Sequence, residues 1–281
     1  MSTKIQVIGL GYIGLPTAIS IAEKTNNVVG CDLDLIKLEN IKSFNVDKNE
    51  PNLIDKLKSV YQSSLEVSSK ISDSDVYIIC VPTPFLDDKT PDLSFIYNVI
   101  EDLSPRLKKG DLIILESTAP IGTTQEIRKI IKKNRTDLNL NFKYDSDNTD
   151  INIAYCPERV LPGDIFNELY QNSRVIGGIT KKCSENAAKI YNLFVEGEIT
   201  ITDSSTAEFV KLAENTYRDI NIAIANEFSM MAEIKNLDIQ EIISITNQHP
   251  RVDILKPGVG VGGHCLAVDP YFLIHSFPHH S

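Results

Sequence analysis

A glycine-rich segment near the end of the sequence carries the residue whose setting best suits covalent chemistry. Residues 257–265 read Pro-Gly-Val-Gly-Val-Gly-Gly-His-Cys, so four glycines precede Cys265. Such a loop lets backbone amides approach an anionic ligand and leaves the thiol open to a substrate. The other four cysteines lie in strand-like or amphipathic helical stretches, where core packing explains them. We therefore predict that Cys265 is a nucleophile, and Asp269 follows it by four residues.

Polar residues upstream of this loop share one face of a predicted helix. Lys211 and Asn215 are spaced i, i+4, and Arg218 and Asp219 follow one turn later. Glu158, in Cys-Pro-Glu-Arg, follows a predicted strand and places a carboxylate at the end of that strand. Taken alone, a helical lysine is usually a surface charge, and Glu158 is equally ordinary.

A glycine fingerprint opens the chain. Gly9, Gly11 and Gly14 form G-x-G-x-x-G directly after a predicted strand and at the start of a helix, and Asp32 closes the next strand. In a dinucleotide site Gly9 allows the tight turn, Gly11 admits pyrophosphate, and Gly14 allows close helix–strand packing. The acidic side chain of Asp32 would bond ribose hydroxyls and repel a 2′-phosphate, which favours NAD over NADP. The alternative is a glycine turn in another α/β fold.

Two further turns follow predicted strands. Pro82 and Thr83 come after VYIICV, and Ser117 and Thr118 come after LIILE. In a parallel sheet both turns lie at the carboxyl ends of strands, where ligands bind. Without that context they are only proline-stiffened turns.

Strand and helix patterns alternate through the first two hundred residues, which predicts βαβ units and a doubly wound, mostly parallel α/β sheet covered on both faces. The polar stretch 137–150 is predicted to be a surface excursion. The predicted strands are 4–10, 27–31, 76–81, 112–116 and 151–155, and the predicted helices are 12–24, 33–41, 93–107 and 123–133.

The pattern changes near Asp203. Ser205 and Glu208 have capping-box spacing, and residues 205–236 then contain neither proline nor glycine. A helix of this length, apolar on several faces, is predicted to connect domains and to form a homodimer. We expect a Rossmann-like domain over 1–202, and over 203–281 the long helix with a helical and loop segment that carries the cysteine.

Composition excludes several partners. The chain has 281 residues, a net charge of −10 and five cysteines without a C-x-x-C pair. An acidic balance disfavours nucleic acid and anionic membranes. No apolar run reaches the roughly 18 residues of a membrane span, and no signal-peptide layout opens the chain. We expect a cytoplasmic protein without a metal site, its closing histidines belonging to a frayed terminus.

Seven stretches of the chain together resemble the UDP-sugar 6-dehydrogenase family. They extend from residue 7 to residue 272, and CPERVLPG, VKLAENTYRD and GVGGHC point to the N-acetylhexosaminuronate branch of that family. The seven stretches are VIGLGYIGLPTA, ICVPTPFLDDKTPDL, ILESTAPIGT, AYCPERVLPG, NSRVIGG, TAEFVKLAENTYRDINIAIANE and HPRVDILKPGVGVGGHCLAVDPYF.

The resemblance implies a four-electron oxidation of a sugar C6 hydroxyl to a carboxylate with two NAD⁺ in succession. Cys265 matches the nucleophile that forms a thiohemiacetal and then a thioester. Lys211 and Asn215 match the groups around the developing alkoxide. Asp269 and Thr118 match positions that handle protons and a water, and Glu158 matches the carboxylate implicated in thioester hydrolysis.

The same resemblance implies two sets of binding residues. The substrate would be a UDP-N-acetylhexosamine: UDP-N-acetyl-D-mannosamine, with UDP-N-acetylglucosamine as the alternative. The expected NAD-binding residues are Gly9, Gly11, Tyr12, Ile13, Gly14, Asp32, Pro82, Thr83 and Thr118. The expected substrate-binding residues are Arg159, Val160, Leu161, Lys211, Asn215, Arg218, His249, Arg251 and Gly262.

The chain departs from the family after the cysteine loop. Family members continue into a C-terminal domain that binds the UDP moiety, and residues 276–281 resemble no start of such a domain. We therefore expect a truncated chain that binds NAD but turns over little, because remote binding energy positions the reacting carbon. The alternative is a catalytically silent NAD-binding, dimerising fragment.

Overall fold

The computed structural model describes residues 3–140, 143–146, 148–161, 163–259 and 266–277. The chain divides into two compact units: the first comprises residues 1–84 and 92–208, and the second comprises 85–91 and 209–281. The division therefore falls after Glu208 rather than after residue 202. Glu208 accepts hydrogen bonds from Gly122 and Thr124, and these bonds hold the first turn of the long helix to the first unit.

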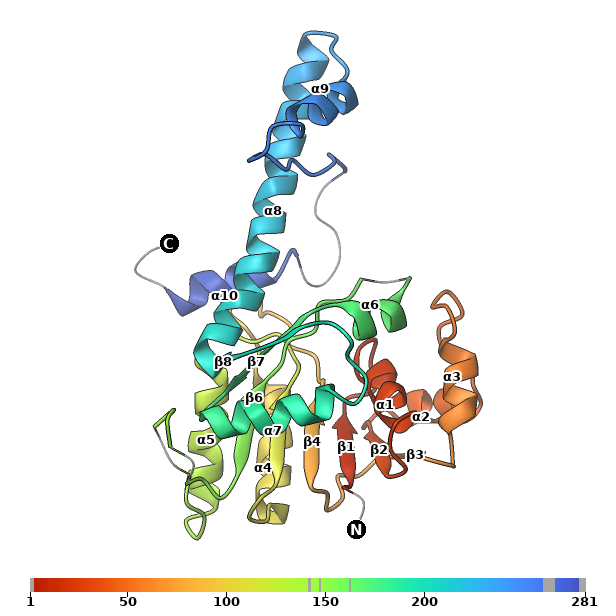
Figure 1. The fold of residues 1–281 in the computed structure, drawn as a ribbon, viewed down its shortest axis with the longest axis vertical. Coiled ribbons are helices and arrows are strands. Elements are labelled where there is room, and N and C mark those ends of the chain that lie inside the picture. Colours follow the sequence, from red (N-terminus) through yellow and green to blue (C-terminus); the bar gives the residue numbers. More distant parts are fainter. Residues whose placement is uncertain (1–2, 141–142, 147, 162, 260–265, 278–281) are drawn as a thin grey trace. The chain divides into compact units, whose positions relative to one another are not determined.

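The first unit is built on an eight-stranded sheet in the order β3-β2-β1-β4-β5-β6-β7-β8 (Figure 1). The pairs from β3 to β6 are parallel, β6 and β7 pair antiparallel, and β8 is parallel to β7. This arrangement confirms the predicted mostly parallel sheet. The strands are β1 (Ile5–Ile8), β2 (Val28–Cys31), β3 (Leu65–Ser68), β4 (Val76–Ile79), β5 (Leu112–Leu115), β6 (Asn152–Tyr155), β7 (Arg174–Gly178) and β8 (Ile199–Asp203).

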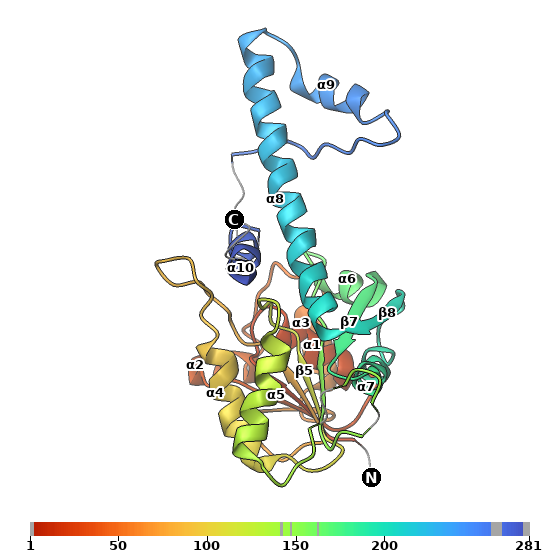
Figure 2. The same cartoon turned by 90° about the vertical axis from the view of Figure 1, so that its left-hand side faces the viewer.

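Helices cover both faces of this sheet, which is why its central strands are apolar and buried along their whole length. Figure 2 shows α4 (Ser94–Leu103) and α5 (Thr123–Asn134) on one face and α7 (Lys181–Tyr191) on the other. The covering confirms the doubly wound prediction. The remaining helices of this unit are α1 (Gly14–Ala22), α2 (Leu35–Lys42), α3 (Leu53–Val60) and α6 (Ile165–Gln171).

The long helix is confirmed as α8 (Ser204–Ile234), 31 residues long. Its predicted capping box is wrong, because the Asp203 carboxylate accepts the N–H and hydroxyl hydrogen bonds of Thr206. The Glu208 carboxylate is engaged by Gly122 and Thr124, so it is not the reciprocal partner of Ser205. Among the described residues no helix has the length and apolar character that a membrane crossing needs.

The second unit folds back along α8. After α9 (Ile239–Thr246), an extended segment is held by asparagine side chains that imitate strand pairing. Asn221 accepts from the N–H of Leu255 and donates to the carbonyl of Asp253, and Asn226 accepts from the N–H of Gly258. The segment leads towards α10 (Asp269–Ser276). Asparagine suits this role because one amide supplies both a donor and an acceptor.

Candidate dinucleotide and catalytic site

The glycine loop has the geometry that its sequence predicts. Gly9 adopts a φ of +92°, and a Cβ there would lie 2.6 Å from the carbonyl oxygen of Cys80. A Cβ on Gly14 would lie 1.8 Å from the carbonyl oxygen of Gly9, so α1 packs on the loop too closely for any side chain. A Cβ on Gly11 would meet no atom within 4 Å. The loop therefore closes on its inner side and is open at Gly11.

Asp32 directly follows β2 and is held in place by three hydrogen bonds. Its carboxylate accepts from the backbone N–H of Leu10 at 2.8 Å and of Asp34 at 3.0 Å, and from Lys37 Nζ at 2.7 Å. Burial raises the pKa of Asp32, but the hydrogen bonds from Lys37 and the two N–H groups outweigh it and hold the pKa below its usual value. Asp32 is therefore a fixed negative charge beside the glycine loop.

The geometry and charge of these residues fit NAD. The open side of Gly11 admits a phosphate to the backbone, and the N-terminus of α1 has neither a side-chain cap nor an acidic residue in its first turn. An anionic pyrophosphate is favoured at such a helix end. The Asp32 carboxylate would supply the acceptor that ribose hydroxyls need.

The turns after β4 and β5 are joined to each other. The hydroxyl of Ser117 donates to the carbonyl oxygen of Val81 at 2.7 Å. This bond places Pro82 and Thr83 beside the turn that carries Thr118, at the carboxyl edge of adjacent parallel strands. Both turns therefore lie at the carboxyl edge of the sheet, and their role in binding a ligand stays a prediction.

The loop after β6 carries Glu158, Arg159, Val160 and Leu161. The Glu158 carboxylate accepts from the N–H of Val160 at 2.8 Å, and Arg159 Nη1 donates to the carbonyl oxygen of Ser173 at 3.0 Å. Within α6, Glu168 accepts from the N–H of Leu161 at 2.7 Å. The loop is therefore ordered by α6 and by the residue before β7.

A buried polar cluster lies beneath this edge, and the sequence alone assigned it no role. Glu116 is 2% exposed and accepts from Tyr191 at 2.6 Å, from the Cys80 thiol at 3.0 Å and from Thr17 at 3.3 Å. Burial first, and then the charge of Glu116, raises the pKa of Cys80 well above its usual value. The cluster joins α1, the end of β4 and α7, and it keeps the thiol protonated.

Arg174 belongs to the same region. It is 1% exposed, and its Nη1 donates to the carbonyl oxygen of Pro157 at 3.4 Å. Burial opposes its charge, but nearby negative groups such as Glu116 hold the pKa of Arg174 above its ordinary value. Its position opposite the end of β6 follows from the antiparallel β6–β7 pairing, which the sequence pattern did not reveal.

Three of the predicted catalytic residues belong to the second unit. Lys211 and Asn215 are 4% and 6% exposed, and Asp269 is 2% exposed. Asn215 Nδ2 donates to the Asp269 carboxylate at 2.5 Å, which joins residues 54 positions apart. Burial distinguishes Lys211 and Asn215 from the ordinary surface charges that such a helix could carry.

The other predicted substrate residues are more exposed. Arg218 is partly buried on α8, while His249 and Arg251 are exposed, with the N–H of Arg251 donating to His249 Nδ1 at 3.3 Å. Cys265 and Gly262 lie outside the described residues. Within the described part of the chain no cluster of histidine, cysteine and carboxylate side chains could hold a metal ion.

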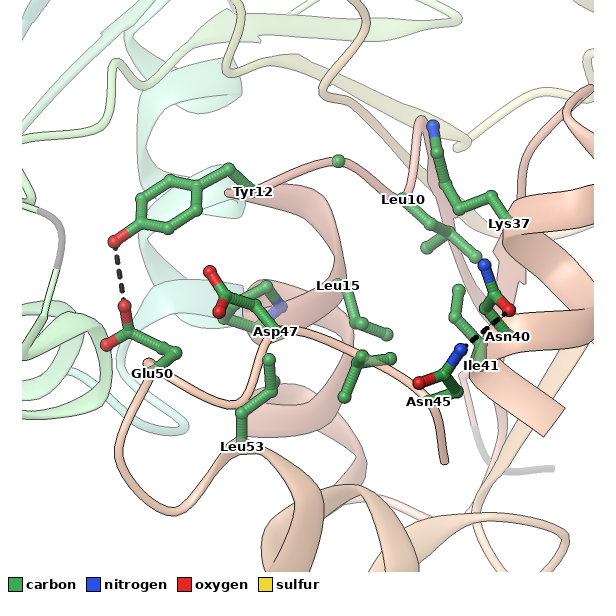
Figure 3. Close-up of a pocket in the computed structure, with 13 residues that line it drawn as sticks. Leu10, Tyr12, Leu15, Lys37, Asn40, Ile41, Asn45, Asp47, Glu50 and Leu53 are labelled. Carbon is green, nitrogen blue, oxygen red and sulfur yellow. Dashed lines mark hydrogen bonds between the residues drawn. The ribbon is translucent and has the colours of Figure 1, made fainter. Parts of the chain in front are cut away.

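A pocket of about 300 Å³ lies behind the glycine loop (Figure 3). Apolar side chains line it from α1 (Leu15), α2 (Ile41) and α3 (Leu53), and Tyr12 and Glu50 stand at one side. Glu50 is 6% exposed, and the Tyr12 hydroxyl donates to it at 2.9 Å. Glu50 is not among the residues predicted from the sequence, because a lone carboxylate in a polar stretch belongs to no recognisable motif.

Comparison with known proteins gives two family matches. The profile of the UDP-glucose/GDP-mannose dehydrogenase family, NAD binding domain, matches residues 3–195, and that of the central domain matches residues 205–281. Together they cover nearly the whole chain and agree with NAD as the cofactor of the first unit.

Individual relatives are similar over most of this chain. An NDP-N-acetyl-D-galactosaminuronic acid dehydrogenase from Ralstonia nicotianae and a UDP-N-acetyl-D-mannosamine dehydrogenase from Yersinia pestis are each 46% identical over 98% of the chain. The solved structure of a UDP-D-ManNAc dehydrogenase from Pyrococcus horikoshii superposes with a TM-score of 0.90 at 43% identity, and covers 98% of the chain. The chain spans 65% of the two relatives and 64% of that structure.

Proposed function

Since the chain belongs to the UDP-glucose/GDP-mannose dehydrogenase family and contains its NAD-binding domain, we propose that it serves the NAD-dependent oxidation of UDP-N-acetyl-D-mannosamine at C6 to the uronate. The observation that carries the proposal is the buried group Lys211, Asn215 and Asp269. Burying a lysine, an amide and a carboxylate costs folding free energy. Stabilisation of a developing oxyanion, which needs a cation and a hydrogen-bond donor, explains why these groups are buried together.

The residues divide the work as follows. The glycine loop and Asp32 would hold NAD⁺, and two NAD⁺ bound in succession would each supply the acceptor for one hydride. Lys211 stabilises the alkoxide, and Asn215, oriented by its bond to Asp269, donates to the same charge. The Cys265 thiolate adds to the aldehyde as a thiohemiacetal, whose oxidation leaves a thioester. Glu158, Asp269 and Thr118 manage the water that hydrolyses the thioester and the protons released.

The identity of the sugar is the finer part of the proposal. Relatives of equal identity carry names that refer to different N-acetylhexosamines. UDP-N-acetyl-D-mannosamine is favoured by the name of the Yersinia pestis relative and by the similar solved structure. The competing substrates are UDP-N-acetylglucosamine and UDP-N-acetylgalactosamine, which differ from it in configuration.

The test is NADH formation, with each of these three sugar nucleotides and with UDP-glucose, by this chain joined to the part of the Yersinia pestis relative that the chain does not cover. We expect UDP-N-acetyl-D-mannosamine to give the highest kcat/KM, with two NADH per sugar oxidised. If another N-acetylhexosamine gives a higher kcat/KM, the proposed sugar is wrong and the proposed reaction stands. NADH from none of the four, under conditions where NAD binds, contradicts the proposal and favours an NAD-binding module.

For the 281 residues by themselves we propose NAD binding with little turnover. The matched relatives have longer chains, and substrate contacts far from C6 lower the barrier by positioning it. A calorimetric NAD titration, run beside the NADH assay, separates binding from turnover. Rapid NADH formation by this chain contradicts the second half of the proposal.

We also propose a homodimer formed through α8. Tyr217, Ile220, Ile224, Phe228 and Met231 recur at helical spacing, and each is at least 40% exposed. An apolar stripe of this length is typical of a helix that packs against a second helix. A second copy of the chain supplies a matching stripe by symmetry.

A further inference from the structure

The carboxylate of Glu50 lies between two loops that the proposed function assigns to different ligands. Its Oε2 accepts from the hydroxyl of Tyr12 at 2.9 Å and from the backbone N–H of Gly163 at 3.0 Å. Its Oε1 accepts from the backbone N–H of Ile165 at 2.7 Å. Tyr12 belongs to the glycine loop, whereas Gly163 and Ile165 follow the loop that carries Glu158.

Glu50 takes the place of a helix cap. α6 begins at Ile165, and the side chain of its N-cap residue Asp164 accepts from the Asn167 side chain at 3.0 Å but makes no capping bond to the helix backbone. The first backbone donor of α6, the N–H of Ile165, is instead satisfied by Glu50, a residue 115 positions earlier in the chain. The negative charge also suits the helix N-terminus. The start of α6 therefore depends on a side chain from a different part of the fold.

The loop before α6 depends in turn on that helix. Glu168 accepts from the N–H of Leu161 at 2.7 Å, and Asn172 Nδ2 donates to the carbonyl oxygen of Arg159 at 2.7 Å. Residues 158–161 are thus fastened to α6, and α6 is fastened to Glu50. Figure 3 shows the opposite end of the connection, where the Tyr12 ring reaches from the glycine loop to Glu50.

Among the described residues, Tyr12, Gly163 and Ile165 donate the hydrogen bonds that hold this carboxylate. Glu50 is 6% exposed, so water does not replace a lost partner cheaply. Burial, reinforced by the neighbouring Glu50 charge, raises the pKa of Tyr12, which keeps its hydroxyl a donor. A shift of Tyr12 therefore moves the acceptor that orders α6, or breaks a buried hydrogen bond.

We propose that Glu50 is a positioning residue that couples the glycine loop, through Tyr12, to the substrate loop 158–161. The coupling rests on the proposed function for the identity of that loop. NAD bound beside Tyr12 orders residues 158–165, and by reciprocity a ligand on that loop tightens NAD. In a reaction that uses two NAD⁺ in succession, the link makes each cofactor exchange sensitive to the sugar.

The test is hydrogen–deuterium exchange of peptides covering residues 158–171, with and without NAD, at a concentration that saturates each variant. In the wild type we expect NAD to slow exchange by about fivefold or more, and in Tyr12→Phe and Glu50→Gln by less than about twofold. Tyr12→Phe keeps the ring and removes only the hydroxyl, so it is the variant to trust if Glu50→Gln unfolds.

Tyr170→Phe is the matched control. The Tyr170 hydroxyl donates to Glu23 at 2.9 Å and accepts from Lys56 and Ser20; these bonds join α6 to α1 and α3, and none of the three partners belongs to the glycine loop. The Tyr170→Phe change removes a tyrosine–glutamate hydrogen bond of the same length as that between Tyr12 and Glu50. We expect NAD still to slow hydrogen exchange in this variant. Slowing retained in Tyr12→Phe, or lost equally in Tyr170→Phe, overturns the coupling.

The failures of the two proposals are distinguishable. If NAD binds the wild type without slowing exchange in residues 158–171, the coupling is wrong and the dehydrogenase function stands. If slowing occurs but no sugar nucleotide yields NADH, the coupling between the loops stands and the identity of the second ligand is wrong.

Discussion

The carboxylate of Glu208, in the first turn of α8, accepts hydrogen bonds from both the N–H and the hydroxyl of Thr124, 84 residues earlier. A third bond, from the N–H of Gly122, leaves Glu208 as the cap of α5. The group is fully buried, and burial raises its pKa to about 7. A helix of the sheet unit thus begins on a side chain from the long helix.

This burial predicts a pH-dependent stability. The pKa of Glu208 in the folded state lies above the unfolded value of about 4.3. The stability that the protonated side chain contributes is therefore fully present below about pH 4.3 and is lost as the pH rises to about 7. The glutamine of Glu208→Gln does not titrate. Between pH 5 and pH 8 the free energy of unfolding should therefore fall less in this variant than in the wild type, by up to about 3 kcal/mol. Urea denaturation at a series of pH values measures the free energy of unfolding of both proteins.

Glu126→Gln is the control for this experiment. Glu126 lies on α5, its side chain is 48% exposed, and its removal should leave the pH profile of the wild type unchanged. Parallel profiles for the wild type and Glu208→Gln would mean that the three hydrogen bonds keep Glu208 ionised.

The glycine loop predicts opposite effects of two alanines. Gly14→Ala places a methyl group 1.8 Å from the carbonyl oxygen of Gly9 and should cost at least about 2 kcal/mol of stability. Gly11→Ala meets no atom and should change stability by less than about 0.5 kcal/mol, while NAD affinity falls about tenfold or more. Thermal unfolding and NAD titration read the two effects, and unchanged NAD affinity in Gly11→Ala would exclude the backbone approach.

Asp32→Ala should weaken NAD much more than it alters the fold. Losing a charged acceptor for the ribose hydroxyls costs about 1.5–3 kcal/mol, or roughly 10–100-fold in affinity. Asp34→Ala is the neighbouring control, because Asp34 caps α2 through the N–H groups of Ile36 and Lys37. That variant should lose about 1 kcal/mol of stability and keep its NAD affinity. If Asp32→Ala binds NAD as the wild type does, Asp32 is not the ribose ligand.

Cys265→Ser should abolish net formation of the acid, because an alkoxide at this position gives no thioester. Cys183→Ala is the comparison, since Cys183 is a buried core thiol on α7. Acid and NADH are measured together in a protein that turns over. Rapid acid production by Cys265→Ser would rule out the thioester route.

Ile224→Glu should separate the proposed dimer. A charge in the middle of the α8 stripe would be desolvated by the partner helix, while in a monomer Ile224 is already 43% exposed and tolerates the change. Size-exclusion chromatography with light scattering measures the mass. A wild-type monomer at micromolar concentration would contradict the α8 dimer.

Much of the fold was predictable because it is encoded locally. Three patterns were sufficient to predict it, and each involves only residues that are close together in the chain. They are the glycine spacing at 9, 11 and 14, the four-residue apolar strands and the proline-free stretch after Asp203. The antiparallel β7 escaped prediction because its RVIGG pattern is that of any buried strand and does not state a direction. Arg174 was overlooked for the same reason, since its burial depends on that pairing.

The sequence by itself determined the dinucleotide fingerprint, the alternation of strands and helices and the long helix, because steric and hydrophobic rules act over one or two turns of chain. The tertiary structure alone decided where the buried carboxylates bond. Glu50 reaches Ile165 and Glu208 reaches Thr124 across 115 and 84 residues. A buried carboxylate takes whichever donors packing leaves unsatisfied, and no local pattern encodes which those are.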